Sequence, residues 1–344
     1  VISGQGALVG HDPQPLATAL IDDDLLLVAS GRGVLEQALD VSQLPDQHQL
    51  GDQRLQRQVA ELGEGVALLT ASPHALEHWL QLPELVAQRD DLSGLVASLR
   101  PEGSTLAVDG RLGFRQALGT DPWPGLTDLT ASAGGHARWL AQLQSPARLL
   151  DPSESHPLAQ WFAPVLKQHL ADQPAADAVV GADAGPLLWQ DQPEGWLLAT
   201  RPQSPARDAV DARLQEQGLT RSELEGDGEV LSVWTRLVRQ RGRQPGVDAQ
   251  LAVAQVRSSA LNWWGESLMA LAQRQNGRAL QPRLNQWQEL TASAQPAQAL
   301  LLADEQARAL LGQWRPWALL QVMAGRPLQD QVRGLAVAVD VDRQ

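Results

Sequence analysis

Two histidines, His74 and His78, stand four residues apart on a segment whose apolar spacing predicts a helix. This separation lets two imidazoles on one helix face share a zinc ion. Metalloproteases that use the spacing also need a glutamate directly after the first histidine, and here that position is Ala75. The sequence offers no third ligand. A metal site at these histidines is therefore one hypothesis, and a solvated helix face is the other.

A serine nucleophile is the next candidate. No Gly-x-Ser-x-Gly motif occurs in the chain. Ser153 and Ser155 lie in an acidic, proline-containing loop next to His156, which resembles a fragment of a catalytic triad. Because the members of a triad usually converge from distant segments, closeness in sequence is poor evidence for one. We interpret this segment as a loop.

The segment Ser30-Gly31-Arg32-Gly33 follows an apolar run and precedes a helical pattern, a place where backbone N–H groups can bind phosphate. It lacks the third glycine of a dinucleotide-binding motif and the Lys-Ser/Thr of a P-loop. A helix N-cap followed by a flexible first turn explains it without a ligand.

The chain has 12 tryptophans, 2 phenylalanines and no tyrosine. Trp263 and Trp264 are adjacent, and neighbouring residues of a strand point to opposite faces. One of them, together with Trp287, could therefore line a groove for a sugar, a lipid or a partner. Filling of the core is the alternative, and a tyrosine-free protein favours it.

A recurring unit positions these residues. Leu69–Leu80 (LTASPHALEHWL) and Leu129–Leu140 (LTASAGGHARWL) share their first four and last two residues. Similar units follow at Leu25–Leu39, Leu197–Leu214 and Leu300–Trp314. In each, an apolar run predicts a strand and a following helix is predicted to begin at an N-cap residue. The expected caps are Ser30, Ser72, Ser132, Thr200 and Asp304.

Turn signals between the strands predict antiparallel hairpins, at Asp22–Asp24, Gln192–Gly195 and Asp227-Gly228. The expected fold class is therefore α+β, with helices packed on one face of hairpin-rich sheets. Ala171–Pro186 is rich in Ala, Asp, Gly and Pro, which suggests a domain boundary. We expect two similar domains, residues 1–174 and 175–344. Each half begins with a hairpin and a strand–helix unit, which suggests that the second domain duplicates the first.

The net charge of −13 and pI of about 4.9 argue against a nucleic-acid surface and disfavour an anionic membrane surface. Arg236, Arg239, Arg241 and Arg243 form a local basic exception, interpreted as a solvated turn between two strands. The absence of cysteine excludes disulfides and thiolate sites. Because the first residue is Val1, we expect a processed or truncated chain. No apolar run approaches the roughly 20 residues that span a bilayer.

With these units in view, the chain resembles an uncharacterised cyanobacterial family, a domain of unknown function. The resemblance rests on Leu25–Asp46, the LTAS-type units, Val233–Leu237 (VWTRL) and Trp263-Trp264. It implies an N-terminal membrane anchor and a location in the periplasm or the thylakoid lumen. It supplies no catalytic residues.

We therefore expect a non-enzymatic extracytoplasmic domain that binds a partner or acts as a scaffold, without a cofactor. The partner would be a protein, not a nucleic acid, and the membrane would be reached only through the anchor. One alternative is a small-molecule module lined by Trp263, Trp264 and Trp287. Another is a metal-dependent hydrolase using His74 and His78.

Overall fold

The computed structural model describes most of the chain. The described residues are 2–5, 15–21, 25–29, 31–42, 44, 53–62, 65–80, 90–115, 123–125, 129–130, 137–205, 207–226, 229–239, 247–292, 296–314, 317, 321 and 331–341.

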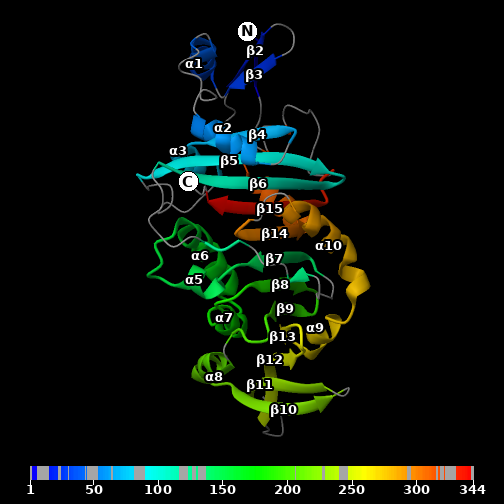
Figure 1. Ribbon diagram of the computed structural model, residues 1–344. Helices are drawn as coiled ribbons and strands as arrows, with labels where there is room; N and C mark the ends of the chain where they lie inside the picture. Colours follow the sequence, from blue (N-terminus) through cyan, green and yellow to red (C-terminus); the bar gives the residue numbers. More distant parts are fainter. Residues whose placement is uncertain are drawn as a thin grey trace.

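Within these residues a sheet of 12 strands forms the body of the molecule, and a three-stranded sheet lies at one end (Figure 1). The small sheet contains β1 (Ile2–Gln5), β2 (Pro15–Ile21) and β3 (Leu25–Ala29). The large sheet contains, in spatial order, β10 (Thr220–Gly226), β11 (Glu229–Arg239), β12 (Val247–Arg257), β13 (Asn262–Gly265), β9 (Gly195–Thr200), β8 (Leu187–Gln192), β7 (Trp139–Leu143), β14 (Gln298–Ala303), β15 (Gly334–Val341), β6 (Thr105–Phe114), β5 (Leu92–Glu102) and β4 (Ala67–Ala71). Its neighbours are antiparallel except β15 and β6, which are parallel.

Helices cover both faces of the large sheet, and α1 (Arg32–Ser42) packs on β2 and β3 of the small sheet. The other helices are α2 (Gln53–Glu61), α3 (Pro73–Leu80), α5 (Pro146–Leu150), α6 (Pro157–Leu170), α7 (Pro174–Val180), α8 (Arg207–Glu216), α9 (Leu268–Gln273), α10 (Gly277–Ala292) and α11 (Asp304–Gln313). Leu198 of β9 packs in a cluster with α3 and α5–α8, whereas its neighbour Leu197 packs in another with α9 and α10. In Figure 1, α6 and α7 accordingly lie on the opposite side of the strands from α10.

The α+β class is confirmed, but the prediction that helices pack on one face is wrong. The physical reason is visible in Leu335–Val341, where apolar residues occupy successive positions and almost all are buried. A strand without polar alternation needs cover on both sides. The sheet is also mixed, because β15 runs parallel to β6.

The predicted hairpins are present. β2 pairs with β3, β8 with β9 and β10 with β11, each antiparallel. Gln192 pairs with Gly195, which leaves a two-residue loop between β8 and β9. Gly195 has φ of +121°, and a Cβ there would lie 2.9 Å from the Cβ of Glu266. This turn therefore requires glycine.

The repeated unit is not confirmed. Ser72 behaves as expected, since its Oγ accepts a hydrogen bond from the N–H of Ala75 at the start of α3 (3.3 Å). Thr200, however, lies inside β9, and Asp304 is the first residue of α11 rather than its cap. Trp139 and Leu140, predicted as helical, begin β7. Ser30 and Ser132 lie outside the described residues.

The division into residues 1–174 and 175–344 stays a prediction. The boundary falls at the first residue of α7. Strands from the two sides of it are hydrogen-bonded neighbours, because β7 lies between β8 and β14, and β6 pairs with β15.

Candidate functional site

The three tryptophans predicted to bind a ligand lie in the core. Trp263 and Trp264 do point to opposite faces of β13, as adjacent residues must. Trp263 packs with Trp287 of α10 on one face, and Trp264 packs against Trp234 on the other, with ring centroids 5.6 Å apart. All three are buried, because helices cover both faces of the sheet. Each indole has a packing role, and ligand binding by them stays a prediction.

The two histidines belong to α3, where the side chain of His74 is exposed. The side chain of His78 lies outside the described part of the chain. Among the described residues, no group of three or more His, Cys, Asp or Glu side chains is arranged to hold a metal ion. The described residues therefore supply no further ligand for a metal ion at His74 and His78. In the Ser30–Gly33 segment, Arg32 forms an ion pair with Glu36 one turn later on α1 (2.7 Å).

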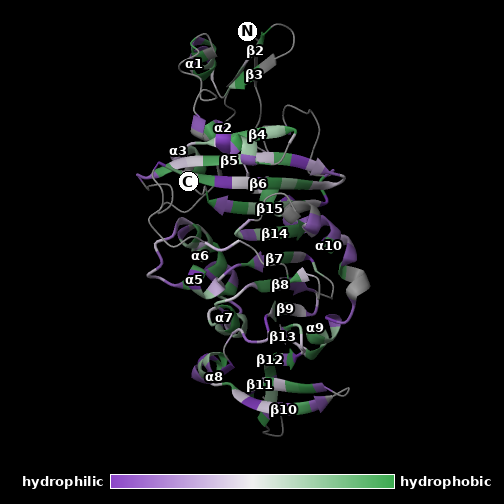
Figure 2. Cartoon of the chain, viewed as in Figure 1, coloured by the Kyte–Doolittle hydropathy of each residue, from purple (hydrophilic) through white to green (hydrophobic). Residues whose placement is uncertain are grey.

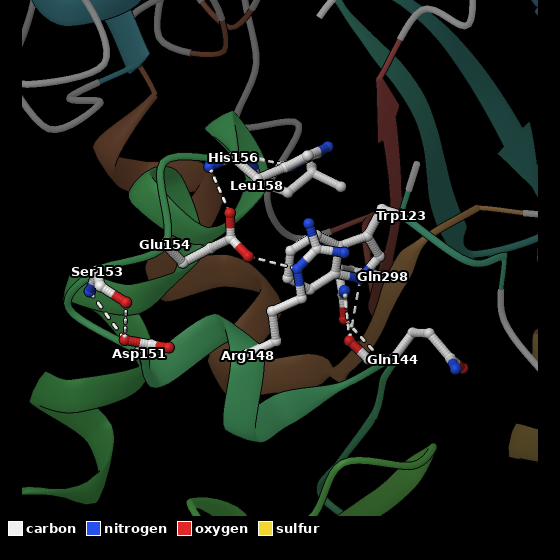
Figure 3. Close-up of polar contacts among 9 residues, drawn as sticks. All are labelled: Trp123, Gln144, Arg148, Asp151, Ser153, Glu154, His156, Leu158 and Gln298. Carbon is white, nitrogen blue, oxygen red and sulfur yellow. Dashed lines mark hydrogen bonds and ion pairs between the residues drawn. The ribbon is translucent and has the colours of Figure 1, made fainter. Parts of the chain in front are cut away.

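Ser153 and His156 do not form a nucleophile–base pair. The Oγ of Ser153 donates to Asp151 Oδ1 at 2.7 Å, and the Ser153 N–H donates to the same oxygen at 2.8 Å (Figure 3). The Nδ1 of His156 accepts the backbone N–H of Leu158 at 3.2 Å, so this buried imidazole caps α6. The resemblance to a triad fragment arises from two local turns.

The same loop contributes to a polar network, which we call the Arg148 clamp (Trp123, Gln144, Arg148, Glu154, Gln298). The guanidinium of Arg148 lies over the ring of Trp123, 4.3 Å from its centroid, and pairs with Glu154. Burial raises the pKa of Glu154, but hydrogen bonds from Arg148 and from the His156 N–H outweigh it and leave the pKa lowered. The carboxylate is thus held in its ionised form.

The clamp joins segments far apart in sequence. The backbone carbonyl of Gln144 accepts from Trp123 Nε1 (3.0 Å) and from Gln298 Nε2 (3.1 Å), while its N–H donates to Gln298 Oε1 (3.0 Å). The side chains of Trp123, Gln144 and Gln298 are buried. Figure 3 shows Trp123, Arg148 and Gln298 converging between α5 and β14. The arrangement connects the ends of β7 and β14 and supplies no nucleophile.

A second buried polar cluster centres on Asp183, in the segment Ala171–Pro186 that was predicted from sequence as a domain boundary. Its Oδ1 accepts from Ser204 Oγ and from the Gly185 N–H (3.1 Å), and its backbone carbonyl accepts from Ala147 N (2.8 Å). Burial raises the pKa of Asp183 to about 6, against the effect of these hydrogen bonds. The carboxyl Oδ2 is buried and has no hydrogen-bond partner among the residues that the structure describes. Asp183 joins three loops, which sequence could not predict because Ser204 is distant along the chain.

A shallow hollow of about 730 Å³ lies at the start of α11. Its two arginines are already paired, Arg138 with Asp191 (2.7 Å) and Arg308 with Asp304 (2.7 Å). Asp304 and Glu305 add negative charge to the first turn of the helix. Among the described residues that line the hollow, no arginine is left unpaired to favour an anionic ligand.

Residues 4–344 match the model of a family described as "Protein of unknown function (DUF3352)". The chain belongs to this family. The predicted resemblance to an uncharacterised family is thereby confirmed. No curated protein and no solved structure matches the chain. In the described part of this DUF3352 protein, no helix is both long and apolar enough to cross a bilayer.

Several exposed aliphatic residues of this DUF3352 protein lie on the outer strands β10–β12, at the opposite end of the molecule from the small sheet (Figure 1), where green residues reach the outer strands in Figure 2. They fall at two places: Leu224 and Val230 lie where β10 pairs with the start of β11, and Leu237, Val238 and Val247 lie where the end of β11 pairs with the start of β12. The sequence placed VWTRLV in a strand but gave no reason to expect these side chains to lack cover. The sequence feature that could have indicated an exposed segment here was the run of Arg236, Arg239, Arg241 and Arg243.

Proposed function

We propose that this protein is a non-enzymatic binding or scaffolding domain and that the β10–β12 end of its sheet is the contact surface. The observation that carries the proposal is the exposure of Leu237 and Val247, at 71 and 65 %, on one face of the paired strands β11 and β12. Exposed aliphatic side chains that form a contiguous patch mark a contact surface.

The polar clusters support the non-enzymatic part of the proposal. Glu154 is neutralised by Arg148, the Nδ1 of His156 is occupied by a backbone N–H, and Ser153 donates to Asp151. A nucleophile needs a base within hydrogen-bond reach, and these groups are instead used to hold loops. The Trp-lined module and the metal-dependent hydrolase have no comparable support, since the indoles are buried and the described residues supply no third metal ligand beside His74.

We further propose that the domain is extracytoplasmic. This location rests on the family resemblance, and a chain without cysteine is compatible with an oxidising compartment. Fractionation of cells that produce the full-length protein would test it. Recovery in the cytosolic fraction would contradict it.

Turnover assays test the absence of catalysis. The purified chain is incubated with chromogenic ester, phosphate, glycoside and peptide substrates, with and without Zn²⁺, beside the variants Glu154→Gln, Asp183→Asn and His74→Ala. We expect rates equal to the buffer blank for every protein. A rate above blank that one of these variants abolishes would overturn the proposal and identify the active group.

A further inference from the structure

At the β10–β12 end of the large sheet, a helix covers one face and the other face is partly open. Val210 and Leu214 of α8 pack in the same cluster as Trp234 of β11. Leu231 and Leu251 point to the other face, because they pack at the margin of the cluster that contains residues of α9 and α10. In Figure 1, α8 accordingly lies on the opposite side of the strands from α9. α9 packs on β9, β12 and β13, and beyond it this second face carries exposed aliphatic side chains.

The strand register defines which residues share the second face. Directly paired residues of antiparallel strands lie on the same face, and residues alternate between faces along each strand. Leu231 pairs with Leu224 of β10, and Thr235 pairs with Leu251 of β12. We call the resulting set the β10–β12 face. It consists of Thr220, Ser222 and Leu224 of β10, of Leu231, Val233, Thr235 and Leu237 of β11, and of Val247, Ala249 and Leu251 of β12.

Charge is segregated from the β10–β12 face. None of its residues is ionisable, although the whole chain carries a net charge of −13. The ionisable residues that alternation places on the opposite face of the same strands are Arg221, Glu223, Glu225, Arg236, Asp248 and Arg257. At the margins, Glu229 pairs with Arg274, and Arg239, whose side chain lies outside the described residues, ends β11. The described part of this face is therefore an uncharged patch on an acidic protein.

We propose that the β10–β12 face packs against the same face of a second copy of this chain. A two-fold dimer brings identical surfaces together, so each charge on the contact meets a like charge nearby. An uncharged aliphatic face is free of that penalty and complements itself. Two chains of net charge −13 repel each other, and this face lets them meet where neither presents a carboxylate. A highly charged partner would find no opposite charge to pair with here.

The shape of the face also suits a second copy. Sheets pack face to face about 10 Å apart, with strand directions about 30° apart, when their twists match. Two copies have the same twist. The face spans three strands about 4.8 Å apart and about 15–25 Å long, an area on the order of 300 Å². A standard interface buries roughly 800 Å² on each partner. We therefore expect a reversible dimer that dissociates on dilution.

Sedimentation velocity of the full chain tests the proposal. The chain is measured over about a hundredfold range of concentration, at low and high salt. We expect a monomer–dimer equilibrium that added salt shifts toward the dimer. Salt screens the repulsion between two acidic chains and leaves the burial of aliphatic side chains intact. A contact that depended on ion pairs would respond in the opposite direction.

Adjacent positions of β11 provide a matched pair of variants. Leu237→Asp places a carboxylate on the β10–β12 face, where the dimer would bury it, and should weaken association at least about tenfold. Val238→Asp introduces the same carboxylate at the next residue, on the opposite face, and should stay within about twofold. Val247→Asp is a second variant of the face and should repeat the effect of Leu237→Asp. All three positions are exposed, and thermal unfolding checks that each variant is folded.

Thiol labelling locates the contact. Because the chain has no cysteine, Ala249→Cys and Asp248→Cys each give a single reactive site. Both positions are exposed in the single chain, and they lie on opposite faces of β12. The labelling rate at position 249 should fall as the protein concentration rises, because the dimer covers that face. The rate at position 248 should stay constant.

The inference rests on the proposed function for its choice of surface, and the two fail in different ways. A chain that is monomeric at every concentration, a dimer that salt dissociates, or equal effects at positions 237 and 238 would overturn the second-copy proposal. If the monomeric chain instead binds phosphatidylcholine vesicles and Leu237→Asp abolishes that binding, the contact surface stands and its occupant is lipid. If the turnover assays detect catalysis, the proposed function fails and the sedimentation result is unaffected.

Discussion

The guanidinium carbon of Arg148 lies 4.3 Å from the centroid of the Trp123 ring while the same group pairs with Glu154. The side chains of Arg148 and Glu154 are 27 and 14 % exposed, so the pair is only weakly screened by water. The substitution Arg148→Met leaves the mostly buried charge of Glu154 without its ion-pair partner. We expect a loss of about 1–3 kcal/mol in the free energy of unfolding, measured in urea.

The matched control for that loss is Arg308→Met. Arg308 pairs with Asp304 one helical turn away, with both side chains about half exposed. Such a pair contributes about 0.3–0.5 kcal/mol. Equal effects of the two substitutions would show that the clamp stabilises the fold no more than a surface ion pair.

Stability should depend on pH through Asp183. Its pKa is raised from 3.8 to about 6 by burial, so the unfolded chain releases this proton first. The contribution of Asp183 is fully present below pH 3.8 and is lost as pH rises through about 6. Between pH 3.5 and pH 7.5, the free energy of unfolding of wild type should therefore fall by up to about 3 kcal/mol relative to that of Asp183→Asn.

Ser204→Ala gives the second measurement for this cluster. The Ser204 hydroxyl donates to Asp183 and favours its ionised form. Removing it should raise the pKa further and shift the loss of stability to higher pH. A pH profile identical for wild type and Asp183→Asn would contradict the assignment.

Because Trp264 is buried, replacing it with alanine should leave a large cavity that destabilises the fold. Its ring packs against Trp234, and its Nε1 donates to Thr200 Oγ1 (3.4 Å). Trp264→Ala should lower the free energy of unfolding by about 3–5 kcal/mol, whereas Val165→Ala, at an exposed site, should change it by less than about 0.5 kcal/mol. A small effect of Trp264→Ala would revive the hypothesis that this indole serves a ligand.

Alanine substitutions at Gly195, Gly218 and Gly31 should lower the free energy of unfolding by graded amounts. Gly195→Ala meets both a positive φ and the Glu266 side chain, and should cost about 2–3 kcal/mol. Gly218→Ala has a positive φ but open space, and should cost about 1 kcal/mol. Gly31→Ala has neither constraint and should be nearly neutral. Thermal unfolding of the three variants checks the order.

Local features of the fold followed from local sequence signals. The turn residues at 192–195 predict the β8–β9 hairpin, and Ser72 caps α3, since each depends on residues only a few positions apart. The unbroken apolar run at 335–339 is a local signal of a strand buried on both faces, and the expectation of helices on one face overlooked it. The tryptophans illustrate the limit: alternation placed Trp263 and Trp264 on opposite faces, but nothing local reveals which helices cover those faces.

The long-range arrangement could not be predicted. β14 and β15, from the last part of the chain, lie between β7 and β6 in the sheet. The clamp contact between Gln144 and Gln298 exists only because of that insertion. Asp183 likewise meets Ser204 through loops that the hydrophobic pattern does not connect. Each of these contacts depends on the order of strands, which periodicity does not encode.

The place of β15 also bears on how the protein is made. On the ribosome, β6 and β14 are synthesised before the strand that lies between them, so each has an open edge until residues 334–341 emerge. Open edges invite pairing with other nascent chains. The sheet is therefore completed only after β15 has been synthesised, and a chain stalled before β15 would be a natural client for chaperones.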